Sequence, residues 1–133
     1  ADPRHVWAWL IRAARWSEWY PHCRKLTFEG ASGPDLALGV RFAWNTLGVR
    51  VRTVVEEWQP YERLAWRGAT PGGTGYHAWV IEPRPRGCCI VTEETQRGVV
   101  PTIARWYIRR ALSNAHDIWL ARLVQQARSG GPS

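Results

Sequence analysis

The spacing of apolar residues divides the chain into two helical regions with a region of β-strands between them. Near the start, apolar residues recur at helical intervals from Val6 to Ile11. Asp2-Pro3 precedes them, with Asp as a helix cap and Pro at the first helical position. A second, short helical turn is expected over residues 17–20. Both pieces are too short to be stable alone, so they must pack on a larger element.

Between residues 26 and 98 the apolar period changes to two, which is typical of strands with one buried face. Glycine, proline and asparagine interrupt this pattern at short intervals, and no helical stretch intervenes. The pattern predicts five or six strands in an antiparallel meander. The clearest strands cover residues 39–44, 49–55, 64–67, 76–81 and 89–94.

The last part of the chain returns to the period of a helix. One apolar stripe consists of Ile103, Tyr107, Ala111, Ala115, Ile118 and Leu123. The stripe predicts one helix from about Pro101 to Ala127, which at roughly 1.5 Å per residue is about 40 Å long. The expected fold class is α+β, in which two short helices, an antiparallel sheet and a long closing helix follow one another.

Length and composition indicate one domain of residues 1–133, because 15.2 kDa is an ordinary domain size. Three cysteines, two of them adjacent, do not form a disulfide framework, so a cytoplasmic location is expected. No apolar run reaches the roughly 20 residues of a membrane span. The net charge of +7 comes almost entirely from arginine and is weak evidence for nucleic-acid binding.

The two faces of the predicted sheet differ in chemistry. The face richer in large apolar groups is expected to meet the long helix, whereas the other meets water and carries Arg41, Arg50, Arg52 and Arg67. The inner face also holds polar residues, and these are Thr53, Glu57, His77, Thr92, Glu94 and Gln96.

Polar groups on an aromatic face allow two interpretations, because an unpaired buried carboxylate costs several kcal/mol. Either His77 and Glu94 pair near a strand end and only stabilise the fold, or they project into a cavity as its polar anchors. The walls of such a cavity would be Phe42, Trp44, Trp66 and Trp79.

Other kinds of site find little support in the sequence. The four histidines are scattered, without H-x-x-x-H or C-x-x-C spacing, so no metal site is expected. Glycine motifs for phosphate or dinucleotide binding are missing, so no cofactor is expected. The outer arginines lack the exposed aromatics on which RNA bases stack, so no nucleic-acid partner is expected.

Short motifs along nearly the whole chain resemble those of a known family. They are Ala1-Asp2-Pro3-x-x-Val6-Trp7-x-x-Leu10, Trp16-x-x-Trp19-x-Pro21, Gly39-x-x-Phe42-x-Trp44, Val55-x-Glu57-x-x-Pro60, Leu64-x-Trp66-x-Gly68, His77-x-Trp79-x-Ile81-x-Pro83, and Thr92-x-Glu94 before Gly98. In order and spacing they resemble the START-like helix-grip (SRPBCC) superfamily, in its polyketide cyclase/dehydrase branch.

The resemblance implies a curved antiparallel sheet around a long C-terminal helix, two short N-terminal helices and a lipophilic tunnel. The family's usual first strand is not visible before Ala1. Without it, one sheet edge is open to a partner strand, as in a homodimer.

The leading hypothesis is a cyclase or dehydratase acting on a hydrophobic small molecule such as a polyketide. His77 is the expected acid or base, and Glu94 orients it or relays its proton. The expected substrate-binding residues are Phe42, Trp44, Thr53, Trp66, Trp79, Thr92, Gln96, Tyr107 and Asn114. Two alternatives stay open, which are a non-catalytic carrier or sensor with the same cavity, and a module that binds RNA or protein through its arginines.

Overall fold

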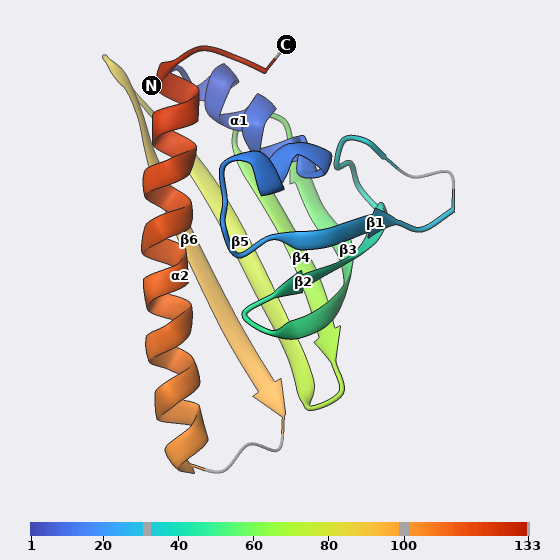
Figure 1. The fold of residues 1–133 in the computed structure, drawn as a ribbon. Coiled ribbons are helices and arrows are strands. Elements are labelled where there is room, and N and C mark those ends of the chain that lie inside the picture. The colour runs from blue at the N-terminus through green and yellow to red at the C-terminus, as the bar shows by residue number, and fades with distance from the viewer. Residues whose placement is uncertain (31–32, 99–101, 133) are drawn as a thin grey trace.

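A computed structural model describes residues 1–30, 33–98 and 102–132, without the side chains of residues 102–104 and 108. It confirms a helix-grip fold, a curved six-stranded antiparallel sheet with a long helix along one side (Figure 1). The strands pair in chain order and are β1 (Arg24–Phe28), β2 (Arg41–Thr46), β3 (Val49–Gln59), β4 (Arg63–Thr70), β5 (Gly73–Arg84) and β6 (Gly87–Gly98). The helices are α1 (Pro3–Ile11), the short 3₁₀-helix η1 (Ala13–Glu18) and α2 (Thr102–Arg128).

The N-terminal helix begins as its sequence predicts. The Asp2 carboxylate accepts a hydrogen bond from the backbone N–H of Arg4 at 2.8 Å, and Pro3 occupies the first helical position. The second helical piece starts earlier than expected and is the 3₁₀-helix η1. Its tight turn carries the Trp16 ring into the core, where the indole N–H donates to the Leu10 carbonyl at 2.9 Å.

The buried face of α2 differs from the stripe that the sequence analysis selected. Among the described residues of α2, the buried side chains follow one another at intervals of four and are Ala115, Trp119, Leu123 and Ala127. Tyr107 and Ile118 are 72% and 36% exposed, so these two assignments were wrong; Pro101 and the Ile103 side chain lie outside the described residues. Ala115 and Leu123 of the expected stripe are buried, and Tyr107 lies on their four-residue row but in the N-terminal half of the helix, where it is exposed.

A β-bulge changes which side chains face inward on β3. Val55 pairs with Trp66, but Glu57 pairs with Ala65, so strand alternation shifts by one residue between them. Glu57 therefore lies on the outer face, contrary to the sequence expectation, and accepts hydrogen bonds from Arg63 and Tyr76. Sequence alternation alone cannot show an extra residue in one strand.

Aromatic rings fill the space between the sheet and the C-terminal half of α2. The Trp16 ring lies 5.2 Å from that of Trp119 and 5.3 Å from that of Trp66, between ring centroids. All four expected cavity walls are buried and belong to this cluster, namely Phe42, Trp44, Trp66 and Trp79. Between the sheet and the C-terminal half of α2, these rings pack against one another and form the core instead of lining an open space.

We expect Trp119→Ala to lower the free energy of unfolding by about 3–5 kcal/mol, because it removes the largest side chain that joins α2 to the sheet. The neighbouring, partly exposed Ile118 is the matched control, and Ile118→Ala should change stability much less. Urea unfolding followed by circular dichroism measures both. Equal losses for the two variants would contradict the assignment of the buried face.

Candidate functional site

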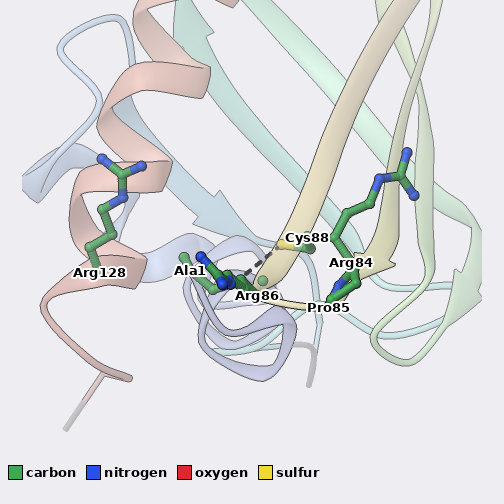
Figure 2. Close-up of a pocket in the computed structure, with 7 residues that line it drawn as sticks. Ala1, Arg84, Pro85, Arg86, Cys88 and Arg128 are labelled. Atoms are coloured by element: carbon green, nitrogen blue, oxygen red, sulfur yellow. Dashed lines mark hydrogen bonds between the residues drawn. The ribbon is translucent and has the colours of Figure 1, made fainter.

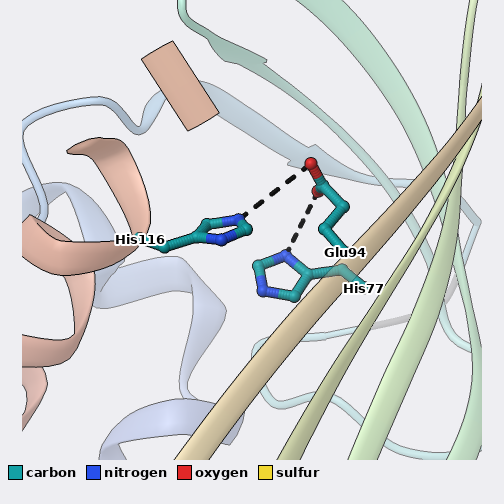
Figure 3. Close-up of side chains that lie close together, drawn as sticks. All are labelled: His77, Glu94 and His116. Carbon is teal, nitrogen blue, oxygen red and sulfur yellow. Dashed lines mark ion pairs between the residues drawn. The ribbon is translucent and has the colours of Figure 1, made fainter. Parts of the chain in front are cut away.

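A polar cluster of His77, Glu94 and His116 lies beside the aromatic core, with one side chain from each of β5, β6 and α2 (Figure 3). His77 and Glu94 are directly opposite each other across the β5–β6 pair, and Trp66 is opposite His77 on β4. Trp66, His77 and Glu94 therefore share one row on the inner face of the sheet. The long helix brings His116 over this row.

The distances within the cluster place the carboxylate between the two imidazoles. Glu94 Oε1 lies 3.5 Å from His77 Nδ1, and Glu94 Oε2 lies 4.0 Å from His116 Nε2. The two imidazole rings are 4.8 Å apart between centroids. The His77 side chain is only 3% exposed, whereas those of Glu94 and His116 are 16% and 17% exposed. A molecule approaching from outside can thus reach Glu94 and His116 more readily than His77.

Thr92 holds the His77 ring in place. Its hydroxyl oxygen lies 2.6 Å from His77 Nε2 and 3.2 Å from the Ala78 carbonyl oxygen. The Thr92 hydroxyl has one proton to donate, so the His77 tautomer depends on which of these two acceptors receives it. In either tautomer Nδ1 is the ring nitrogen that faces Glu94.

The surroundings favour the neutral form of every member of the cluster. Burial raises the pKa of Glu94 to about 7, although a hydrogen bond from Gln96 opposes the shift. Burial, and secondarily the neighbouring His116, holds the pKa of His77 well below its usual 6.5. Burial also lowers the pKa of His116. Near neutral pH, Glu94 therefore exchanges its proton readily while both imidazoles are uncharged, which suits proton transfer.

Within the described residues, the same three side chains form the group that could hold a metal ion. The sequence spacing did not reveal this group because its members come from separate elements. Their donor atoms spread over 4.8 Å. Ligands of one tetrahedral zinc, each about 2.0–2.1 Å from the ion, are only about 3.4 Å apart. The cluster would have to contract around an ion, and its present geometry fits a proton between His77 and Glu94 better.

The other predicted site residues divide into three groups. Thr92 belongs to the cluster through His77, and Gln96, which is exposed, donates to Glu94 at 3.3 Å. The rings of Trp66 and Trp79 contact that of His77. Phe42 and Trp44, on β2, are further away; the Phe42 ring contacts that of Trp66, and the Trp44 ring contacts that of Phe42. The structure does not bring Tyr107 and Asn114 to the cluster, because both are exposed; Tyr107 lies eight residues before the buried Ala115 and Asn114 directly precedes it.

Sequence reasoning missed His116 and Trp119, both on α2. The Trp119 ring lies 5.4 Å from the His77 ring and 5.0 Å from the Trp79 ring, so it forms the helix side of the site. A helical stripe drawn through Trp119 and Leu123 would have included its neighbour one turn earlier, His116.

Several buried hydrogen-bond donors next to the cluster have no partner within the described protein. They are the indole N–H groups of Trp44, Trp79 and Trp119 and the hydroxyl of Thr53. Buried polar groups are normally paired, so these four donors are exceptions within the packed core.

Two open hollows occur near the far end of α2, away from this cluster. One has a volume of about 550 Å³ and is lined by Ala1, Arg84, Pro85, Arg86, Gly87, Cys88 and Arg128 (Figure 2). The other is lined by Cys88, Ile90, Leu120, Ala121, Val124 and Arg128. Neither hollow includes a predicted site residue.

A family model described as "Polyketide cyclase / dehydrase and lipid transport" matches residues 1–128. The chain belongs to this family. Membership confirms the resemblance and places the chain among SRPBCC proteins that bind hydrophobic small molecules. No helix among the described residues combines the length and apolar character needed to cross a membrane.

Solved structures share the family's fold. A hypothetical protein of Helicobacter pylori, jhp0584, is 29% identical with a TM-score of 0.86, over 95% of this chain and 80% of that one. CalU16 from Micromonospora echinospora is 13% identical with a TM-score of 0.62, over 97% and 76%. DynU16, from the dynemicin biosynthetic locus, is 16% identical with a TM-score of 0.68, over 99% and 45%. No curated protein sequence matches the chain.

We expect Glu94 to make the stability of this protein depend on pH. Its pKa is raised on folding from about 4.5 to about 7, so the folded state holds a proton that the unfolded state has lost between these values. Stability should therefore fall, by about 3 kcal/mol for this group, as the pH rises from about 4.5 to about 7. Urea unfolding across this range, compared with Glu94→Gln, isolates the effect from that of the histidines.

The adjacent Glu93, which is exposed on the opposite face of β6, is the matched control. Glu93→Gln should keep the pH dependence of the wild type. A wild-type protein whose stability differs from that of Glu94→Gln by the same amount at every pH would contradict the raised pKa.

Proposed function

We propose that this protein is a cyclase or dehydratase for a hydrophobic, oxygenated small molecule of polyketide type, with Glu94 as its acid and base. One observation carries the proposal, namely a mostly buried carboxyl group with a pKa of about 7 that lies 3.5 Å from a ring nitrogen of a neutral imidazole. Proton removal next to a carbonyl needs a base whose pKa lies near the working pH. The family's description supports the substrate class.

The exposure of the side chains assigns their roles. The Glu94 carboxylate can take a proton from the carbon next to a substrate carbonyl, and the resulting enolate oxygen can accept a hydrogen bond from His116. In a dehydration, the C–O bond at the β carbon then breaks as the C=C bond forms. The hydroxyl leaves with the proton from Glu94 as water, which restores the carboxylate. The buried His77 positions Glu94, so the roles expected for these two from sequence are exchanged.

A cyclisation uses the same groups. After Glu94 removes the proton, the enolate carbon attacks a second carbonyl of the same chain, and the new alkoxide takes the proton back from Glu94. No oxidant or reductant is consumed. The neighbouring aromatic rings would restrict the conformations of a flexible substrate, which lowers the entropic cost of bringing its two reacting carbons together.

The proposed position of the substrate is on the row of the sheet next to the cluster. The inner row Val55–Trp66–His77–Glu94 is followed by the row Thr53–Gly68–Gly75–Gln96. Two adjacent positions of the second row carry no side chain, and Thr53 supplies an unpaired hydroxyl there. A Cβ atom on Gly68 would meet the Val51 side chain at 2.7 Å, so the open position of this row is Gly75. A hydrophobic molecule lying on Gly75 would have its edge at Glu94.

The second candidate is a carrier that binds the same molecule without changing it. The family's description includes lipid transport, and the unpaired buried donors would bind ligand oxygens equally well in a carrier. The two functions differ in one observable, since an enzyme changes the mass or the bonding of its ligand and a carrier returns it unchanged.

We expect Glu94→Gln to lower turnover by about 10²–10⁴-fold, because an amide cannot exchange the proton. The assay incubates the protein with β-hydroxy ketones that carry aromatic or long alkyl groups and follows the loss of water by mass spectrometry. Glu93→Gln is the matched control and should keep the wild-type rate. His77→Gln should move the pH of half-maximal rate away from about 7. Recovery of the bound ligand with both its mass and its fragmentation pattern unchanged would instead identify a carrier.

We expect Gly75→Leu to abolish binding of these ketones while the protein stays folded. A Cβ atom at this position meets its nearest neighbours, Thr95 O and Gln96 Cγ, at the ordinary distances of 3.6 and 3.8 Å. The added side chain therefore fills the space above the second row without straining the sheet. Circular dichroism checks folding and intrinsic fluorescence titration checks binding. Unchanged affinity would show that the ligand does not lie on this row.

A further inference from the structure

The N-terminal half of α2 exposes aromatic and basic side chains that the proposed chemistry does not use. Trp106 and Tyr107 are 61% and 72% exposed, and Arg109 and Arg110 next to them are exposed as well. We call this set the aromatic–arginine face. It lies on the half of the helix that is remote from both chain ends (Figure 1).

The charge on this face is uncompensated. No acidic residue occurs in the sequence between Glu94 and Asp117, whereas Arg97, Arg105, Arg109 and Arg110 fall in that interval. Within the described chain, Arg109 and Arg110 form no ion pair, and the Arg110 guanidinium lies 5.8 Å from the centre of the Trp106 ring. The arginines are thus available to phosphate groups, which guanidinium binds in a bidentate manner.

We propose that the aromatic–arginine face docks the protein on anionic phospholipid bilayers. Tryptophan and tyrosine have apolar bodies with one polar group, so they favour the depth of the lipid headgroups. Arginines on the same side of a helix add electrostatic attraction to anionic lipids. The chain's net charge of +7 favours the same surface.

A nucleic acid would match the charge but not the aromatic geometry. Proteins that read RNA on a sheet hold their aromatic rings flat for bases to stack on. Here the rings stand on the convex surface of a helix, and Arg110 already lies over Trp106. The observations therefore favour a bilayer.

Docking through this face would bring the His77–Glu94–His116 cluster close to the membrane. Tyr107 and His116 are nine residues apart on one helix, which is about 14 Å along its axis. A hydrophobic molecule dissolved in the bilayer would have a short path to the cluster. The docking proposal stands on the exposed face alone and does not depend on whether the cluster is catalytic.

Co-sedimentation of the purified full chain with vesicles tests the proposal. We expect the protein to pellet with vesicles of phosphatidylcholine and phosphatidylglycerol, and not with phosphatidylcholine alone. The double variant Arg109→Gln/Arg110→Gln should bind about thirtyfold more weakly, as expected for two arginines near an anionic surface. Trp106→Ala/Tyr107→Ala should also lose binding, and in the wild type acrylamide quenching of fluorescence should fall when vesicles are added.

Matched controls lie elsewhere on the surface. Leu38 is 66% exposed, and Arg41 and Arg52 are exposed on the outer face of the sheet. Leu38→Ala and the double variant Arg41→Gln/Arg52→Gln, which loses the same charge, should bind vesicles as the wild type does. Circular dichroism confirms that each variant is folded.

Three results would overturn the proposal. They are no pelleting of the wild type with either vesicle, an equal loss of binding in the control variants, and tighter binding to single-stranded RNA than to anionic vesicles at the same salt concentration. The last result would make the face a nucleic-acid surface.

Discussion

The contact of Trp119 with the aromatic inner face of the sheet is the interaction on which the rest of the structure depends. Its ring lies 4.3 Å from Tyr20 and 5.0 Å from Trp79, so one side chain joins α2 to both the N-terminal segment and β5. Because the helix is fixed there, His116 one turn earlier must face β5 and β6. The site is therefore a consequence of core packing and not a separate loop structure.

Burial makes the cluster chemically useful and also costly for the fold. A carboxyl group and two imidazoles would be better solvated in water, and each is held in its neutral form by the low polarity of its surroundings. The protein limits this cost with the hydrogen bond between His77 and Thr92 and by leaving Glu94 partly open to solvent. Groups whose pKa is shifted towards neutrality in this way are typical of sites that transfer protons.

The two halves of α2 differ in burial and in charge. The C-terminal half is buried and stabilises the fold through Ala115, Trp119, Leu123 and Ala127. The N-terminal half leaves Trp106 and Tyr107 exposed and carries no negative charge before Asp117. One long helix thereby connects an aromatic core, a proton-transfer cluster and an exposed basic surface.

The sequence by itself determined the fold class, the approximate limits of α2, and the shared face of His77, Glu94, Trp66 and Trp79. These features follow from local periodicity, since every second residue of a strand points to the same side. Periodicity does not register the bulge that turns Glu57 outward. It also does not show how far along α2 the burial extends, which is why Tyr107 was assigned although it is exposed. Only the tertiary structure decided these points, because packing of the largest rings sets the rotation of the helix and the contacts between residues distant in sequence.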